Sequence, residues 1–231
     1  MGKVKIKKKS THIDMTAMSD VTVLLLTFFM LTSTFLQKEP VQVITPPSVS
    51  EEKVPDEKLV QVLIGPDGKV YLNLTGAKDS TQLSTETFRS EVLQEAYGSY
   101  SETHPSAPKL TMQQALEFSK IGTFGVPMKD LTSWLGMKME KRDDFLKNEG
   151  GIPIAISVKD GPRNEFQTWL NAVKVVMQRH DLGKDLVGGR GVAIKAGQDS
   201  PYSLVQVVMD NLQTEKLNKF TLMTSLKSEE E

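Results

Sequence analysis

Residues 15–36 read MTAMSDVTVLLLTFFMLTSTFL, and this apolar stretch determines how the rest of the chain is organised. At a rise of about 1.5 Å per residue, a helix over these residues spans roughly the ~30 Å hydrocarbon core of a bilayer. Asp20 is the only ionisable side chain in the stretch. A carboxylate inside a membrane helix costs about 2.5–3.5 kcal/mol to insert, so its presence indicates a function.

The chemistry of Asp20 suggests what that function is. A carboxyl group escapes the cost of burial when it is protonated, because the neutral acid is tolerated in an apolar environment. A group that is neutral in lipid and charged where water reaches it can carry protons, so we expect Asp20 to translocate protons. The alternative is that Asp20 caps a helix that begins at Val21. The apolar run would then be about 24 Å long, which is short for a membrane span.

Polar residues of the apolar stretch share one side of the predicted helix. At about 100° per residue, the side chains of Thr16, Asp20, Thr27 and Thr34 fall within a stripe roughly 40° wide. A stripe of hydroxyls around a carboxyl predicts a face that meets protein or the water of a pore, with the apolar residues elsewhere. The alternative is that these threonines bond only to their own helix backbone.

The charges before the apolar stretch predict its orientation. Residues 1–12 carry five lysines and no acid, so we expect a basic tail that remains in the cytoplasm. The bulk of the chain would then be exported, on a transmembrane helix at residues 13–36. A cleaved signal peptide shares the basic start and the apolar run, but no A-x-A-like cleavage site follows Leu36. The sequence therefore predicts an uncleaved, single-pass anchor.

Composition excludes several classes of protein. The chain has 231 residues, of which 39% are hydrophobic and 25% charged, so most of it should fold in water. A net charge of −1 argues against nucleic acid as the main partner. The absence of cysteine removes disulfides and thiolate metal sites.

Candidate chemistry outside the apolar stretch is sparse. His104 and His180 stand in polar surroundings without a second ligand at metal spacing, which predicts surface residues. The glycine run at 188–191 precedes a predicted strand instead of opening a helix, so it is a poor phosphate cradle. No nucleophile and base are paired in the sequence. We therefore expect no cofactor, no metal and no enzymatic activity.

The chain after the anchor divides into a tether and a domain. Residues 37–58 contain four prolines, which favour an extended, semi-stiff tether that includes a short edge strand over 41–44. We expect a folded domain at 59–228. Its predicted elements are a hairpin of strands 59–64 and 69–74 around Asp67-Gly68, a helix over 85–97, a loop over 98–109, an interrupted helical region over 110–146, a strand over 152–158, a helix over 164–178, a strand over 191–195, a helix over 200–212 and a strand over 220–226. Helices alternating with strands predict an α/β (α+β) two-layer sandwich.

The membrane stretch resembles a known family. The residues that carry the likeness are His12-Ile13-Asp14-Met15-Thr16, Ser19-Asp20-Val21 and Phe29-Met30. They resemble the motif of ExbD and TolR, single-helix subunits of proton-driven motors, and more distantly that of MotB. The stretches 192–197, 201–202 and 207–210 look like the family's last strand and helix. Two departures are Ala17, where the family often has proline, and Thr45-Pro46 in place of a leucine–proline pair.

The resemblance covers about residues 10–97 and 190–227. Residues 98–189 have no counterpart in the short members, so we interpret them as a family-atypical insertion that adds partner contacts or a dimer interface. The resemblance implies a homodimer inside a pentameric ring of ExbB-like multi-pass subunits in the bacterial inner membrane, with the domain in the periplasm. Protons would pass through Asp20. The motion would reach a TonB-like partner and energise outer-membrane transport.

The energy available to such a motor is of a suitable size. One charge that crosses a potential of 100 mV gains about 2.3 kcal/mol, which is comparable with the insertion cost of one carboxylate. Two alternatives remain open at this point. One is a TolR-like subunit of a Tol-Pal type envelope motor, although TolR-type chains often close with an extra amphipathic helix and this one ends at Leu226-Lys227-Ser228 and three glutamates. The other is a periplasmic binding module on an inert anchor.

Overall fold

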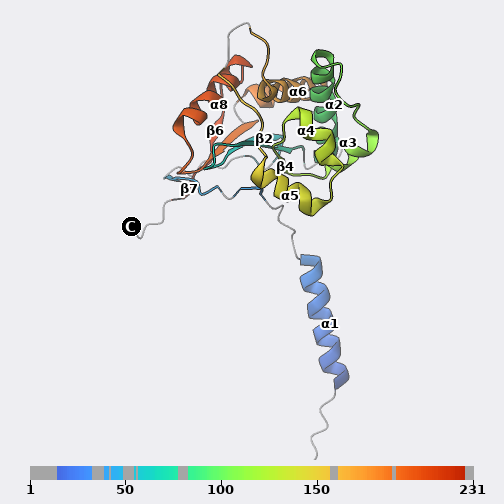
Figure 1. Ribbon diagram of the computed structural model, residues 1–231. Helices are drawn as coiled ribbons and strands as arrows, with labels where there is room; N and C mark the ends of the chain where they lie inside the picture. The colour runs from blue at the N-terminus through green and yellow to red at the C-terminus, as the bar shows by residue number, and fades with distance from the viewer. Residues whose placement is uncertain are drawn as a thin grey trace, which may run out of the picture. The chain divides into compact units, whose positions relative to one another are not determined.

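A computed structural model describes most of the chain, in two units. The described residues are 15–32, 39–41, 43–48, 55, 57–77, 83–156, 161–188 and 191–226. The first unit, residues 1–38, contains helix α1 (Met15–Thr32), and the second unit, residues 39–231, contains all the other elements (Figure 1). We describe each unit by itself and call the second one the sheet domain.

The sheet domain is built on a mixed five-stranded sheet. Its strands are β2 (Leu59–Ile64), β3 (Val70–Thr75), β4 (Thr123–Phe124), β5 (Val192–Ala196) and β6 (Thr221–Leu222), in the order β4-β3-β2-β5-β6. The pairs β2–β3 and β3–β4 are antiparallel, whereas β2–β5 and β5–β6 are parallel. A separate parallel pair joins β1 (Pro47–Ser48) to β7 (Ser225–Leu226). The predicted hairpin is confirmed, and Gly68 takes the positive φ of 72° that its turn requires.

Seven helices are described in the sheet domain. They are α2 (Thr85–Thr103), α3 (Met112–Ser119), α4 (Met128–Leu135), α5 (Met139–Asn148), α6 (Glu165–Arg179), α7 (Gly183–Val187) and α8 (Tyr202–Thr214). Figure 1 shows α2, α6 and α8 gathered on one side of the sheet. One apolar N-terminal helix followed by a mixed sheet with packed helices confirms the predicted fold class.

The residues between 98 and 189 are part of the core. Phe118 of α3, Phe124 of β4 and Trp169 of α6 are all fully buried. Ring centroids lie 4.8 Å apart for Phe118 and Phe124, and 4.8 Å apart for Phe124 and Trp169. Because these side chains belong to the same hydrophobic cluster as β2 and β3, this segment shares its core with the frame of the sheet and is not a separate module.

The same segment covers one edge of the sheet. Strand β4 pairs with β3, and beyond it the Ile152 N–H donates to Val70 O at 2.8 Å. The hydroxyl of Tyr71 donates to Leu146 O at 3.2 Å, which attaches the end of α5 to the same strand. An open sheet edge is a template for pairing with another chain, so residues 123–152 protect β3 from that pairing.

A buried arginine joins three elements. Arg89 of α2 is 5% exposed, and its Nε donates to Leu74 O at 2.8 Å while a terminal nitrogen donates to Ser119 O at 3.3 Å. Burial lowers the pKa of Arg89 to about 10, although the nearby Glu86 acts in the opposite direction. The side chain stays charged at neutral pH and connects α2 to the ends of β3 and α3.

Two helical boundaries differ from the sequence prediction. Helix α2 continues to Thr103, so the predicted loop over 98–109 is wrong for its first six residues. A glycine within a helix is unfavourable but tolerated, and the helix ends where Pro105 disfavours helical backbone in the residue before it. The interrupted region over 110–146 contains α3, α4 and α5, with strand β4 inside the predicted interruption.

Three predicted strands also differ. Residues 152–156 form no strand, because Pro153 has no N–H to donate and Ala155 O instead accepts from the side chains of Asn164 and Asn211. Residues 157 and 158 lie outside the described residues. The tether strand is at Pro47–Ser48 and not over 41–44, and the closing strand over 220–226 is divided into β6 and β7.

A buried carboxylate at the end of α8 binds two cations, one just before α6 and one within α6. Glu215 has a side chain only 5% exposed, and it accepts hydrogen bonds from Arg163 at 2.9 Å and Lys174 at 2.8 Å. Burial by itself raises the pKa of Glu215, but the hydrogen bonds and charges of Lys174 and Arg163 outweigh it and leave the pKa below its usual value.

We predict that Glu215→Gln lowers the free energy of unfolding by roughly 1–3 kcal/mol at neutral pH, because it removes a charge that two cations bind. A lowered native pKa stabilises the fold above the unfolded value and loses this effect as pH falls through the native value. The difference from wild type should therefore shrink in acid. Urea unfolding followed by fluorescence of Trp134 and Trp169 measures it, and Glu102→Gln, at an exposed position, is the control.

A second prediction concerns Gly98 inside α2. A Cβ added there meets no atom within 4 Å, so alanine fits without strain. Gly98→Ala should raise the free energy of unfolding by about 0.5–1 kcal/mol through helix propensity alone. Gly76→Ala is the contrasting variant, because its Cβ would lie 2.6 Å from Leu83 O. Equal stability of the two variants in urea unfolding would contradict this account.

Candidate functional site: a carboxylate in an apolar helix

Helix α1 holds Asp20 in its interior. The helix runs from Met15 to Thr32, so Asp20 is its sixth residue and the alternative that Asp20 is an N-cap before Val21 is wrong. These 18 residues have a mean hydropathy of 1.6 and, at about 1.5 Å each, a length of about 27 Å. Within the described ranges, α1 is the one helix that is long and apolar enough to cross a membrane.

The side chains of α1 form an apolar surface around the helix. None of its residues is buried within the helix unit, and large apolar side chains such as Val21, Leu24 and Phe28 are 59–64% exposed. A continuous apolar surface of this kind marks contact with lipid or with another protein surface. Asp20 lies within that apolar surface.

The hydroxyl groups of α1 bond to its own backbone. Thr27 Oγ1 donates to Leu24 O at 2.9 Å, and Thr22 and Ser19 make similar bonds to carbonyls one turn earlier. For Thr27, the structure thus shows the hydrogen bond to the helix's own backbone that was the alternative to a pore-facing role. A hydroxyl that donates in this way can still accept a hydrogen bond, so a pore-facing stripe of Thr16, Thr27 and Thr34 stays a prediction. Thr34 lies outside the described residues.

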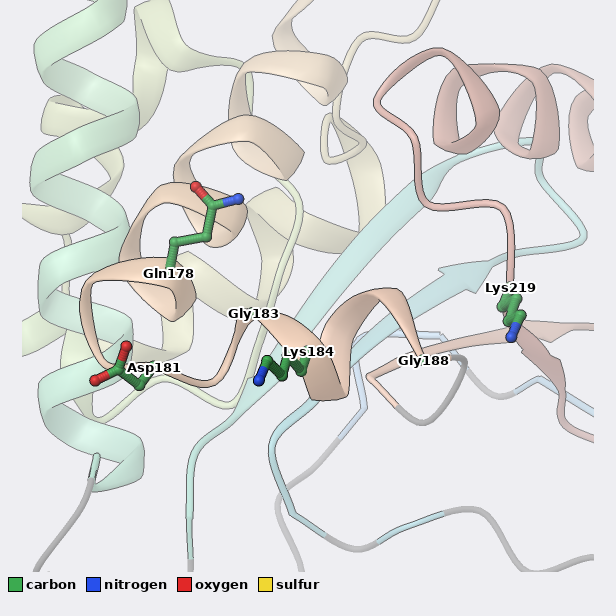
Figure 2. A pocket seen from close by; sticks show the side chains of 6 residues that line it. All are labelled: Gln178, Asp181, Gly183, Lys184, Gly188 and Lys219. Atoms are coloured by element: carbon green, nitrogen blue, oxygen red, sulfur yellow. The ribbon is translucent and has the colours of Figure 1, made fainter.

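A shallow depression of about 560 Å³ lies between the end of α6, α7 and the residues before β6. Its lining residues are Gln178, Asp181, Gly183, Lys184, Gly188 and Lys219. Figure 2 shows that the labelled side chains point in different directions and do not converge on one point. The depression therefore has no arrangement that would hold a ligand.

The glycine run beside this depression has a packing role at Gly191. A Cβ added to Gly191 would lie 2.5 Å from Leu186 Cα, which is closer than any side chain allows. Glycine is required there so that α7 can pack against the start of β5. Residues 189 and 190 lie outside the described residues, so the prediction about a phosphate cradle stays a prediction.

A groove of about 490 Å³ lies between the second half of α2 and residues 107–115. Tyr97 closes its floor by donating a hydrogen bond to Pro108 O at 2.6 Å, and Gly98 and Met112 line it. The groove contains no pair of ionisable groups that could perform chemistry.

The two histidines lie at the surface, as predicted, and each has a neighbouring side chain. His180 Nε2 lies 2.9 Å from a carboxylate oxygen of Glu91, and the ring of His104 stacks on Tyr100 with centroids 4.3 Å apart. Among the described residues, no group of three or more histidine, aspartate or glutamate side chains is placed to hold a metal.

One further titratable group was not expected from the sequence. Glu165, at the start of α6, accepts the Met128 N–H at 2.8 Å and so caps helix α4. Burial raises the pKa of Glu165, while the Met128 N–H and the charges of Lys129 and His104 act against the increase. Its contacts are structural, because they satisfy a helix end.

The comparisons agree with this geometry. Among the described residues, one apolar helix with one carboxylate precedes a mixed sheet domain, which is the arrangement of a single-pass membrane protein. Residues 7–115, just under half of the chain, match the family model described as Biopolymer transport protein ExbD/TolR, and this part of the chain is similar to that family. The match includes Asp20 and reaches α3. No curated protein and no solved structure gives a significant match.

The description of the matched family model names biopolymer transport. The match ends at residue 115, so the stretches at 192–197 and 201–210 that resemble the family's last strand and helix lie beyond it.

The sequence did not reveal an ion pair at the start of the sheet domain. Glu39, which follows the membrane stretch, binds Lys195 of β5 with both carboxylate oxygens at 2.7 Å. The two residues are 156 positions apart, and no local pattern joins them. Only an aligned set of related sequences, in which the two positions changed together, could have indicated this contact.

We predict that Gly191→Ala lowers the free energy of unfolding by about 1–3 kcal/mol, because the new methyl group would collide with the backbone of Leu186.

Adding inorganic phosphate should leave the thermal midpoint of the wild-type chain unchanged beyond the effect of ionic strength. A phosphate-dependent rise in the midpoint that Gly191→Ala removes would instead identify an anion site.

Proposed function

We propose that the chain is an ExbD-like subunit of an inner-membrane motor that uses the proton motive force to energise TonB-dependent outer-membrane transport. The observation that carries this proposal is the position of Asp20, the lone ionisable residue inside an apolar helix. The match of residues 7–115 to the ExbD/TolR family model supports it.

Asp20 has the role of proton carrier in this proposal. An ionised carboxylate in the hydrocarbon core is unfavourable, so Asp20 ionises where polar groups or water reach it and is neutral where lipid surrounds it. Alternation between the two states couples proton passage to movement of α1 relative to its surroundings. Thr16, Thr27 and Thr34, on the same stripe, would face the pore and supply hydroxyl partners along the path.

The exposed surface of α1 fits a ring of partner helices. We propose that two copies of α1 lie within an ExbB-like ring, the pentamer that the family resemblance implies, because a carboxylate that changes protonation needs polar groups on a facing surface. The basic tail at residues 1–12 supports an N-terminus in the cytoplasm and a sheet domain in the periplasm. The sheet domain would then contact a TonB-like protein.

A TolR-like subunit of a Tol-Pal type envelope motor is the alternative within the family, and the family match is common to both. The two differ in partner and in phenotype. Deletion of the gene should abolish uptake through TonB-dependent transporters under the ExbD-like proposal, whereas loss of outer-membrane integrity with normal uptake would support the TolR-like one.

The decisive experiment is Asp20→Asn, which keeps the size of the side chain and removes its ionisation. We expect the variant to insert and to co-purify with its ring partner while proton-dependent transport falls at least 100-fold. Asp20→Glu should retain part of the activity because it still titrates. Thr22→Val, on the opposite side of α1 from Asp20, is the matched control and should behave as wild type.

Transport by Asp20→Asn at the wild-type rate would contradict the motor proposal and favour a binding module on an inert anchor. Replacement of protons by sodium as the driving ion in vesicles tests the coupling ion separately. A sodium-dependent, proton-independent activity that still requires Asp20 would keep the motor and change its ion.

A further inference from the structure

The chain that follows the membrane stretch is attached to the sheet domain by a short segment. We name this segment the strap and define it as residues 39–41, 43 and 44. At its start, both carboxylate oxygens of Glu39 lie 2.7 Å from Lys195 Nζ, with the two side chains 34% and 18% exposed. Glu39 is also the first residue of the second unit of the chain. The strap is therefore anchored at the point where the sheet domain begins.

The rest of the strap lies across the ends of two neighbouring strands. The Gln198 N–H donates to Ile44 O at 3.0 Å. A methyl of Val41 lies 3.4 Å from where a Cβ on Gly65 would be, and a methyl of Val43 lies 3.5 Å from the same position on Gly197. Gly65 and Gly197 directly follow β2 and β5, which pair side by side up to Ile64 and Ala196. The two glycines leave room for the valines.

These contacts are weak compared with those inside the domain. The Glu39–Lys195 pair is partly exposed, and ion pairs of that kind contribute little to stability. Val41 and Val43 are only half-buried, and Ile44 is 73% exposed. By contrast, β2 and β5 consist mostly of fully buried residues. The strap can therefore leave the sheet domain without unfolding it, as the least stable parts of a protein do.

We propose that the strap is a releasable clasp that sets how far the sheet domain can move from the membrane helix. With the clasp closed, six residues, 33–38, separate α1 from the attached Glu39, and fully extended they reach at most about 20 Å. With the strap released, the next attachment to the sheet domain is the pairing of Pro47 with Ser225, so residues 33–46 are freed and reach at most about 50 Å. This inference rests on the proposed motor function, because a moving helix supplies the pull that opens the clasp.

A reversible lock tests the clasp directly. The native chain has no cysteine, so Val43→Cys with Gly197→Cys introduces one pair at a spacing that suits a disulfide. In the full chain assembled with its partners, oxidation should reduce driven transport at least 10-fold, and a reductant should restore it. Each single cysteine variant and the cross-strand pair Gln61→Cys with Asn73→Cys, which locks the domain internally, are the controls. Transport at the wild-type rate with the strap locked would overturn the proposal.

A charge reversal gives a second, independent measurement. In membranes without a proton gradient, the rate at which a maleimide labels Val43→Cys reports how often the strap opens. Glu39→Lys should raise that rate several-fold, because it faces Lys195 with a like charge. Adding Lys195→Glu should restore the original rate by re-forming the pair in reverse. An unchanged labelling rate in Glu39→Lys would show that the ion pair does not hold the strap.

The outcomes separate the clasp from the motor. If Asp20→Asn abolishes transport while the locked strap works normally, the clasp is wrong and the motor stands. If Asp20→Asn transports normally, the motor proposal fails, and the clasp fails with it as a device driven by α1. If both the lock and Asp20→Asn abolish transport and only the lock is reversed by reductant, both proposals are supported.

Discussion

The chain depends on the free energy of one carboxylate in an apolar helix. Asp20 sits in the interior of α1, among apolar side chains. A membrane around α1 would accept the apolar side chains but would oppose an ionised Asp20. In a membrane the helix would be stable only where polar groups reach the carboxylate or where the acid is neutral. Under the proposed function this requirement would make α1 sensitive to protons, and the remaining elements would receive its motion.

The sheet domain meets that role with a rigid core to which residues 98–189 contribute. Phe118 and Trp169 pack on the same cluster as β2 and β3, and β4 covers an edge of the sheet that would otherwise be open. The described residues of this segment bury apolar side chains against the frame and satisfy the backbone of β3. Met112, Leu116, Met139 and Ile156 are 56–78% exposed, so partner contacts, where the segment makes them, would have apolar as well as polar side chains to use.

How far the sequence predicts this molecule depends on the range of each interaction. The hairpin at 59–75 and helix α6, with its capping box of Asn164 and Gln167, follow from neighbouring residues and were predicted nearly to the residue. Asp20 was predicted for the same reason, because the cost of a charge in an apolar run is a local property. Residues 152–156 were not, because their backbone partners, Asn164 and Asn211, come from other elements. The Glu39–Lys195 pair joins distant positions and has no local signal.

Two of the carboxylates that bind cations in the sheet domain differ in how strongly they are held. Glu215 is 5% exposed and bound by two cations, whereas Glu39 is 34% exposed and bound by one. Removing a buried, doubly bound charge from its partners is far more costly than separating a partly exposed pair, because water replaces the lost contacts only in the second case. Under the proposed function, a pull on the chain from α1 would reach Glu39 before any other residue of the sheet domain. The exposed pair and the half-buried valines behind it would then separate first, and the domain beyond them would keep its fold.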